Sequence, residues 1–193
     1  MKSEDILTSF MDMLIVGVNS SASAMSFILY HLSRSQRAQK RLYEELTAVP
    51  KSTMNYEQIS ELPYLKACIK ESLRLVPPFP VLTRILPKNI IVDHYKIPHG
   101  TTMVMAMQVT GLKEENFDDS KRFYPERWLK SDVKELHPLA TLPFGFGSRK
   151  CIGQGLANIM LSTLTAKIIK NYKVEYNYGD ITPVTKLIAM PDH

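Results

Sequence analysis

The feature that most constrains this 193-residue chain is a glycine-rich segment containing Cys151, which leads directly into an apolar run with helical spacing. Residues 144–153 read Phe-Gly-Phe-Gly-Ser-Arg-Lys-Cys-Ile-Gly. Gly145 and Gly147 allow a left-handed backbone or the close approach of a flat group. The spacing predicts a helix over 152–169 with Cys151 at its first turn, where free amide N–H groups and the helix dipole stabilise a thiolate. Such a thiolate can act as a nucleophile, a redox sensor or a metal ligand, and Arg149 is placed to bind an anion.

Other interpretations of this segment compete on the residues alone. A dinucleotide-binding loop requires a third glycine where Lys150 stands, and a P-loop requires a Gly-Lys-Ser/Thr that does not follow. A buried structural cysteine is the plainest alternative. A cysteine hydrolase requires a histidine base, yet no histidine lies in a recognisable catalytic context. The histidines are His31, His94, His99, His137 and His193.

Composition narrows the class of protein further. Hydrophobic residues make up 45% and charged residues 22%, which is typical of a globular domain. A net charge of +5 suits an acidic protein partner but is too dispersed to indicate a nucleic acid. Two cysteines exclude a disulfide-rich scaffold and a Cys-x-x-Cys zinc site. No uninterrupted run of 18 apolar residues predicts a membrane span, and the first residues resemble neither a secretory signal nor a transit peptide.

The order of periodic segments predicts an α+β fold that is mostly α, in one domain. A stretch with few periodic signals, 114–148, is long enough to indicate a functional role. Pro63 opens one predicted helix and Pro77 ends it, while Asn55 is a candidate cap for another. The predicted helices cover 6–32 (much of it buried), 35–46, 56–60, 63–75 and 152–169, and the predicted strands cover 90–92, 95–97, 101–104, 173–178 and 186–190.

The cysteine segment resembles the haem-binding loop of the haem-thiolate monooxygenases, the cytochrome P450 family, written Phe-x-x-Gly-x-Arg-x-Cys-x-Gly. The matching residues are Phe144, Gly147, Arg149, Cys151 and Gly153. By ordinary residue usage, a chance match is on the order of 10⁻⁷ per starting position. The resemblance implies a haem b cofactor with Cys151 as axial thiolate, Arg149 paired with a propionate and Phe144 packed over the loop. Thiolate ligation favours O–O cleavage.

Two further motifs are similar to the same family. Glu71 and Arg74 are separated by three positions, so they can pair on one helix face, although exposed pairs with this spacing are common. By resemblance, Arg127 of a Pro-Glu-Arg segment joins them in a triad that locks the preceding coil and holds the cysteine loop. Arg84 aligns with an arginine that meets the second propionate, the alternative being a solvated basic residue.

The first predicted helix contains Gly17, Asn19 and Ser20. The family places Ala/Gly-Gly-x-Asp/Glu-Thr here, over the iron, where the acid and the threonine relay protons to dioxygen. Ser20 keeps a hydroxyl, whereas Asn19 cannot ionise and can only orient a water. The alternative is structural: a kink, or side chains bonded back to the preceding turn.

Lys66 and Lys70 share one helix face. The surrounding segment is similar to the mitochondrial branch, in which matching lysines dock an acidic ferredoxin; a solvated face is the alternative. Gln154 and Gly155 depart from the arginines usual after the cysteine in that branch. The resemblance therefore implies a ferredoxin-type donor and the matrix side of the mitochondrial inner membrane. The alternatives are an NADPH-dependent flavoprotein reductase and the endoplasmic reticulum membrane.

The resemblance extends over about residues 6–190 and matches the carboxy-terminal, haem-binding portion of a single family domain. It implies hydroxylation of a small lipophilic, steroid-like substrate with O2, with no nucleic-acid partner and a membrane-associated parent protein. Earlier helices of the domain are expected to be missing. The alternative is a catalytically incompetent fragment, or an interaction module that binds haem weakly.

Overall fold

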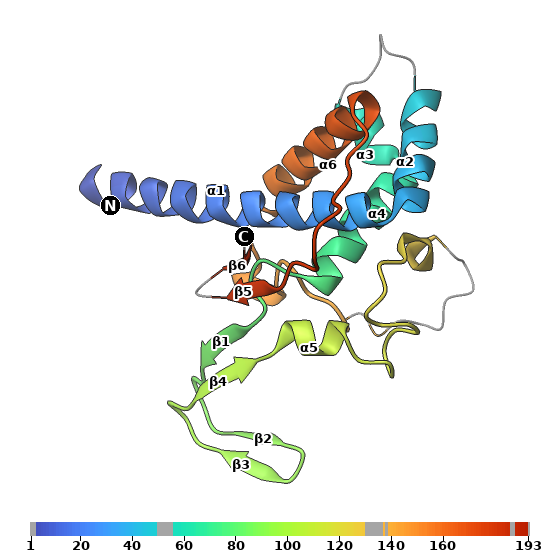
Figure 1. Cartoon of the computed structure of the whole chain (residues 1–193). Helices are drawn as coiled ribbons and strands as arrows, with labels where there is room; N and C mark the ends of the chain where they lie inside the picture. The colour runs from blue at the N-terminus through green and yellow to red at the C-terminus, as the bar shows by residue number, and fades with distance from the viewer. Residues whose placement is uncertain (1–2, 50–55, 130–136, 138, 186–187, 193) are drawn as a thin grey trace.

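The computed structural model describes residues 3–49, 56–129, 137, 139–185 and 188–192. Its longest element is helix α1, Ser3–Arg34, which projects from the rest of the molecule at its amino-terminal end (Figure 1). Phe27, Ile28 and Leu32 in the second half of α1 are fully buried. The first half is not, because its apolar side chains from Ile6 to Val18 are exposed. The prediction that much of this helix is buried is therefore wrong for its first half.

Helix α1 also has the length and composition of a membrane-crossing helix. The absence of an uninterrupted apolar run predicts no membrane span, but the helix is apolar enough on average to cross a membrane. Single polar residues such as Asp12 interrupt its otherwise apolar sequence. The second half of the helix lies against α4 and α6 and serves as a core element.

Four more helices complete the main core with α1: α2 (Gln36–Ala48), α3 (Tyr56–Glu61), α4 (Pro63–Leu75) and α6 (Gln154–Asn171). The core is a single apolar cluster to which each of these helices contributes. Its fully buried members include Leu32, Leu42, Leu46, Leu65, Leu161 and Ile169. The observed boundaries differ from the predicted ones by a few residues at most, as is usual for helix ends. Asn55 lies outside the described residues.

Helix α4 receives its amino-terminal cap from another helix. Leu62 precedes it and offers no side-chain hydrogen bond. Instead the Glu45 carboxylate of α2 accepts the backbone N–H groups of Tyr64 and Leu65, at 2.8 and 2.9 Å. A carboxylate satisfies free amide donors and complements the positive end of the helix dipole. This contact fixes where α4 begins relative to α2.

In the part of the chain that the structure describes, the strands form three separate antiparallel pairs: β1 (Leu82–Ile85) with β4 (Thr102–Met105), β2 (Ile90–Val92) with β3 (Tyr95–Ile97), and β5 (Pro183–Thr185) with β6 (Ala189–Pro191). The β2–β3 hairpin extends away from the helices, and Asp93 takes a left-handed conformation at its turn (Figure 1). The β5–β6 pair lies under α1, where Ser23 Oγ donates to the Ala189 carbonyl. The expected α+β fold, mostly α, is confirmed.

One predicted strand is wrong, and two of the observed strands, β1 and β5, were not predicted. Residues 173–178 form no strand, because the Gln39 side chain satisfies the backbone of Val174 in place of a neighbouring strand. Strand β1 was missed because a four-residue run gains its identity only by pairing with β4. A short helix, α5 (Met107–Gly111), follows β4 and was also not predicted.

The predicted coil over 114–148 contains a 3₁₀ helix, η2 (Pro125–Trp128), and leads into a second, η3 (Gly147–Arg149). Of this stretch, 130–136 and 138 lie outside the described residues. Its described part before η2 is held by backbone carbonyls that accept hydrogen bonds from Arg74 and Arg127. Side chains rather than a backbone ladder therefore fix its path.

Candidate haem-binding site

Cys151 occupies a tight loop between η3 and α6. Its backbone N–H donates to the Phe144 carbonyl at 2.9 Å, and the Lys150 N–H donates to the Gly147 carbonyl at 3.1 Å. Gly145 and Gly147 have φ of 72° and 74°, in the region that only glycine adopts readily. Cys151 is exposed and lies ahead of Gly153, the residue that caps α6. The prediction that Cys151 stands in the first helical turn is wrong, because α6 begins at Gln154.

The loop leaves open space around the sulfur. A Cβ atom on Gly147 would meet no described atom within 4 Å, and one on Gly153 would lie 3.9 Å from Cys151 Sγ. Phe146 and Ile152 on either side are 69% and 88% exposed. Phe144 is half-buried and packs against the main core. The Cys151 thiol is therefore exposed between two exposed apolar side chains, in a loop that packs onto the protein core through Phe144.

The loop also contacts the sheet that carries Arg84. A Cβ atom on Gly145 would lie 3.8 Å from Leu82 Cδ1, so the loop backbone runs against β1. Arg84 is exposed on the same strand, and its guanidinium donates a hydrogen bond to the backbone carbonyl of the preceding Thr83. Arg149 is exposed within η3. Arg149 is therefore part of the cysteine loop, and Arg84 lies on the strand that contacts this loop.

The two predicted proton-relay residues of α1, Asn19 and Ser20, form hydrogen bonds within their own helix. Asn19 Nδ2 donates to the Ile15 carbonyl at 2.9 Å, and Ser20 Oγ donates to the Gly17 carbonyl at 3.4 Å. This is the back-bonding that the structural alternative anticipates. Asn19 is exposed and Ser20 is half-buried, on the boundary between the exposed and the packed halves of α1.

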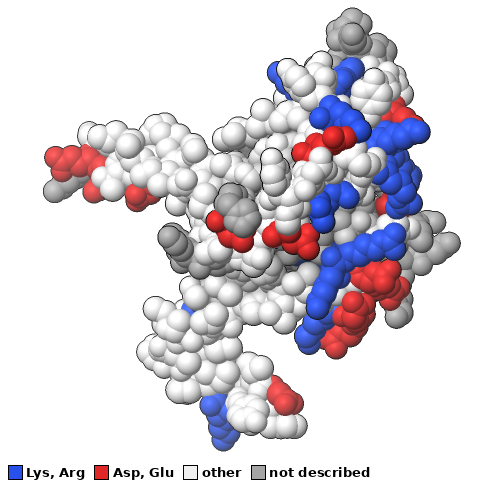
Figure 2. All heavy atoms as spheres, viewed as in Figure 1, with Lys and Arg blue, Asp and Glu red and all other residues white. Residues whose placement is uncertain are grey.

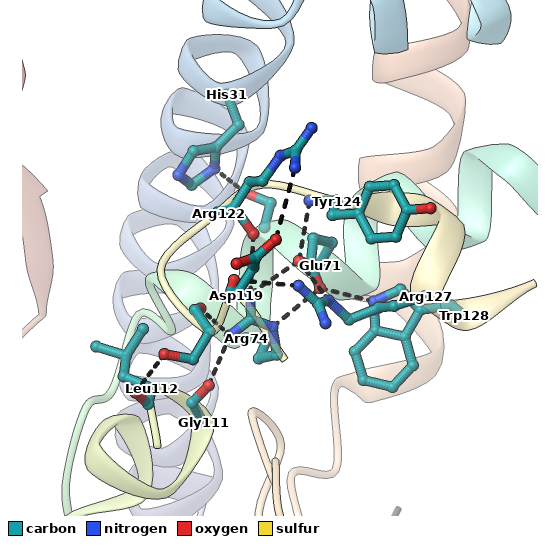
Figure 3. Close-up of polar contacts among 12 residues, drawn as sticks. His31, Glu71, Arg74, Gly111, Leu112, Asp119, Arg122, Tyr124, Arg127 and Trp128 are labelled. Atoms are coloured by element: carbon teal, nitrogen blue, oxygen red, sulfur yellow. Dashed lines mark hydrogen bonds and ion pairs between the residues drawn. The ribbon is translucent and has the colours of Figure 1, made fainter. Parts of the chain in front are cut away.

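Glu71, Arg74 and Arg127 lie together in a buried ion cluster (Figure 3). Arg74 donates from Nε and Nη2 to the two carboxylate oxygens of Glu71, at 2.9 and 2.8 Å. Arg127 Nε donates to Glu71 Oε1 at 2.9 Å. The side chains of Glu71 and Arg74 are fully buried, so the alternative of an exposed pair does not apply.

Further donors complete the cluster and compensate for its burial. Arg74 Nη1 donates to the carbonyls of Gly111 and Ser120, both at 2.6 Å, and the Tyr124 backbone N–H donates to Glu71 at 3.1 Å. Charged groups lose several kcal/mol each when they leave water, so a buried pair is tolerated only when all its donors and acceptors find partners. Here one carboxylate ties α4 to the segment around η2.

Sequence reasoning missed two members of this region. Trp128 donates its indole N–H to Glu71 Oε2 at 2.8 Å, a contact that only its position directly after Arg127 could have suggested (Figure 3). His31 of α1 stacks on Phe123, with ring centroids 5.1 Å apart, and its Nδ1 lies 2.9 Å from Ser72 Oγ. Burial lowers the pKa of His31 to about 4, with Glu71 opposing and Arg74 reinforcing the shift.

The two predicted partner-binding lysines differ in their surroundings. Lys66 is exposed and lies 3.9 Å from a Glu61 oxygen. Lys70 is also exposed, but its ammonium lies 4.0 Å from the centre of the Trp128 ring, and partial desolvation there lowers its pKa. Lys70 is therefore held by a cation–π contact.

Within the described ranges, no group of three or more His, Cys, Asp or Glu side chains could hold a metal ion. A polydentate protein site of the zinc type, which needs such a group, is therefore not found among the described residues.

Comparisons with known proteins give the family. A cytochrome P450 family model matches residues 1–192. The chain is 40% identical over 173 residues to the mitochondrial 1,25-dihydroxyvitamin D(3) 24-hydroxylase of Rattus norvegicus, covering 89% of this chain and 34% of the relative. It is 31% identical over 196 residues to the mitochondrial sterol 26-hydroxylase of Homo sapiens, covering 97% and 37%.

A solved cytochrome P450 superposes with a TM-score of 0.91 at 24% identity, covering all of this chain and 44% of the other, and supports the fold. The chain thus spans about a third of the length of these curated relatives. The resemblance to the family recognised from the cysteine loop is confirmed, and so is the likeness to the mitochondrial branch inferred from the segment around Lys66 and Lys70. The chain belongs to the cytochrome P450 family.

Proposed function

We propose that this chain supplies the haem-binding part of a monooxygenase that hydroxylates a small lipophilic substrate. The observation that carries the proposal is the exposed Cys151 thiol on an open loop with two left-handed glycines, which packs against the main core through Phe144. Residues 1–193 would form the carboxy-terminal portion of a single domain. The exposed apolar first half of α1 supports this view, because a further part of the domain could cover it.

The residues present fit a haem. Cys151 offers one thiol that can ligate iron as a thiolate, and the open space at Gly147 would let a flat macrocycle approach the backbone. Phe144 would support the loop from the core side, while Arg149 and Arg84 would pair with the propionates. When bound, a thiolate-ligated haem supplies the activation of O2 that inserts one oxygen atom into a C–H bond.

The chain's own residues would hold and shape that site. The hydrogen bond from the Cys151 N–H to the Phe144 carbonyl closes the loop and fixes the direction of the sulfur. The Glu71 carboxylate holds Arg127 and Trp128 on the segment that leads to the loop. We therefore assign Glu71, Arg74 and Arg127 a positioning role, in which they keep the loop in place without touching reactants.

Proton delivery is assigned to α1. The Ser20 hydroxyl both donates and accepts a hydrogen bond, so it can pass a proton, whereas the Asn19 amide can only orient a water molecule. Both side chains contact carbonyls of their own helix at present, and each would have to turn from that carbonyl to act. Replacing Ser20 with Ala removes the only hydroxyl in this pair.

The substrate and the electron donor are inferred from the relatives. Their printed names describe hydroxylases of 1,25-dihydroxyvitamin D(3) and of a sterol, both mitochondrial. We propose a steroid-like substrate, a ferredoxin-type donor that docks at Lys66 and Lys70, and a place on the matrix side of the mitochondrial inner membrane. An NADPH-dependent flavoprotein reductase at the endoplasmic reticulum membrane is the alternative arrangement.

The test is the spectrum of the haem-reconstituted protein after reduction under carbon monoxide. A thiolate-type Soret band that disappears in Cys151→Ala is the expected result. Cys68→Ala is the matched control, because Cys68 is the chain's other cysteine and lies buried in the core. A band that survives Cys151→Ala would overturn the assignment of the ligand.

The second candidate is an incompetent fragment or interaction module, favoured by the exposed apolar half of α1. It predicts that residues 1–193 alone take up less than one haem per chain and do not turn over a steroid-like substrate. Stoichiometric uptake together with turnover would exclude it.

A further inference from the structure

His31 lies in the last turn of α1 and points toward the buried ion cluster (Figure 3), away from the charged side chains that colour the surface in Figure 2. We infer that His31 is a positioning residue, which holds α1 against the two segments that the Glu71 carboxylate joins, namely α4 and the segment around η2. The inference rests on the proposed function, because it concerns the helix that carries Ser20. It extends that function by giving the proposed proton-relay helix a fixed place relative to the ion cluster.

The His31 ring contacts both of these segments. Its Nδ1 lies 2.9 Å from the Oγ of Ser72, which directly follows Glu71 on α4. Its face stacks on the Phe123 ring, with ring centroids 5.1 Å apart and planes 8° apart. Ser72 is 1% exposed, so the imidazole meets this hydroxyl inside the protein. A rotation or shift of α1 would therefore disturb two contacts at once.

Phe123 lies between two residues whose backbone groups bond to the ion cluster. The Arg122 carbonyl accepts a hydrogen bond from Arg74 Nη2 at 3.3 Å. The Tyr124 N–H donates to Glu71 Oε1 at 3.1 Å. Both contacts of the imidazole thus fall on residues next to groups that bond within the cluster. A movement of either segment would reach α1 through this ring.

Other buried side chains of α1 make contacts of a different kind. Phe27 and Ile28 are buried in apolar surroundings, and apolar burial is non-directional, so it permits small rotations of a helix. Ser23 does make a directional contact, but its Oγ donates to the Ala189 carbonyl of β6. The directional contact of His31 is made instead with the segments that carry the ion cluster.

The ring makes these contacts in its neutral form at neutral pH. Burial lowers the pKa of His31 to about 4, with the Glu71 carboxylate opposing and the Arg74 guanidinium reinforcing the shift. A neutral imidazole has one N–H donor and one acceptor nitrogen, so it can pair with a hydroxyl in either direction. His31 therefore approaches the cluster without adding a third cation to a carboxylate that already holds Arg74 and Arg127.

The position of His31 bears on Ser20 because both lie in one continuous helix. They are about 16 Å apart along its axis, or about three turns. A helix without a proline or a break moves nearly as a unit over that length, so a ring fixed at one end limits the movement of the hydroxyl at the other. The plain alternative is that the imidazole only fills space in the core, in which case its hydrogen bond to Ser72 is dispensable.

The test is hydrogen–deuterium exchange of the full chain, followed by mass spectrometry over residues 117–128. Ser72→Ala removes the hydrogen bond, and His31→Phe removes it while keeping an aromatic ring beside Phe123. Each variant is expected to raise exchange over 117–128 by about three- to tenfold, the effect of losing one hydrogen bond. The double variant should exceed either single variant by less than about twofold, because all three lack the same bond.

Ser23→Ala is the matched control, because it removes one hydrogen bond from the same helix on the side of β6. It should change exchange over 117–128 by less than about twofold. In the haem-loaded protein, Ser72→Ala and His31→Phe should also share a change in the ferric electron paramagnetic resonance g values that the control lacks. That spectrum reports the surroundings of the iron, which a ring that merely fills space would not alter.

Ser72→Ala is the decisive variant, because alanine is the strongest helix former and leaves α4 intact. Unchanged exchange over 117–128 in this variant would overturn the positioning role. A rise by the same factor over α2 would overturn it too, since it would show a general loss of stability, and so would g values that match the control. Exchange is measured without haem, so it decides whether His31 holds α1 independently of the cofactor. Absence of a Soret band in the unmutated protein indicates instead that the proposed function has failed.

Discussion

The indole N–H of Trp128 donates to Glu71 Oε2 at 2.8 Å, on a carboxylate whose side chain is completely buried. The same Oε2 accepts Arg74 Nε, while Oε1 accepts Arg74 Nη2 and Arg127 Nε. Among the described residues, every donor that reaches Glu71 comes from α4 itself or from the segment around η2. The carboxylate is therefore the joint between these two parts of the fold.

Trp128→Phe keeps an aromatic ring beside Lys70 but removes the donor to Glu71. We expect a loss of about 1.5–3 kcal/mol in the free energy of unfolding, the range for hydrogen bonds to charged groups. Urea unfolding followed by circular dichroism measures this, because Trp128 is the only tryptophan and its fluorescence is lost. Tyr172→Phe, an exposed aromatic, is the control. Equal stability of the two variants would show that the indole N–H contributes nothing.

Arg74→Lys keeps the charge but not the planar fork. Lysine cannot serve both oxygens of Glu71 and the carbonyls of Gly111 and Ser120 at once. Breaking a buried pair costs about 3–5 kcal/mol, and we expect most of that loss here. Thermal unfolding measures the effect. Arg34→Lys is the matched control, because Arg34 pairs with Asp180 at the surface, and a similar loss in both variants would contradict the assigned role.

His31 predicts a specific dependence of stability on pH. Its folded pKa of about 4 lies below the ordinary value of 6.5, so the folded state binds fewer protons than the unfolded state between those values. The stability that depends on His31 staying neutral is complete above pH 6.5. The free energy of unfolding then falls by up to about 3 kcal/mol as the pH falls towards 4. His31→Phe removes this titration. The difference in unfolding free energy between the two proteins should fall across that window, and a constant difference would contradict it.

Much of the fold follows from local sequence signals. Helix α4 spans Pro63–Leu75 as predicted, because proline suits a first turn and Pro77 cannot continue a helix. The β2–β3 hairpin has the predicted strands, since short β-branched and apolar runs flank a turn at Asp93. The cysteine loop was recognisable because it is contiguous in sequence.

What could not be predicted depends on partners distant in sequence. The strand expected over 173–178 does not form, and the side chain of Gln39 on α2 takes both backbone hydrogen bonds of Val174. Trp128 donates a hydrogen bond to Glu71, and Glu45 accepts one from the backbone of Tyr64. Both partners are distant in sequence, so no local pattern predicts these contacts. The start of α6 was misplaced because Ile152 continues the apolar periodicity, while the glycine at 153 defers the helix to Gln154.

Glu45 provides a prediction about such a distant contact. Glu45→Ala leaves the Tyr64 and Leu65 N–H groups at the start of α4 without their acceptor. We expect a loss of about 1–2 kcal/mol, as for removal of a helix cap. Glu44→Ala is the matched control, because Glu44 is the exposed neighbour on the same helix. Urea unfolding of both variants tests this, and equal midpoints would show that the cap is dispensable.

Alanine variants at two glycines can distinguish the cost of backbone strain from the loss of the space that a cofactor needs. Gly147 and Gly100 both have left-handed φ, of 74° and 82°, and a Cβ at either would meet no described atom within 4 Å. Alanine at either position should therefore cost a similar amount of stability, about 1–2 kcal/mol. Only at Gly147 would the added methyl group occupy open space in the cysteine loop, where we propose that the cofactor lies. Gly147→Ala should lose haem faster than Gly100→Ala when apomyoglobin is added as an acceptor, at matched thermal stability. If the two variants release haem at the same rate, the open space at Gly147 is not what admits the cofactor.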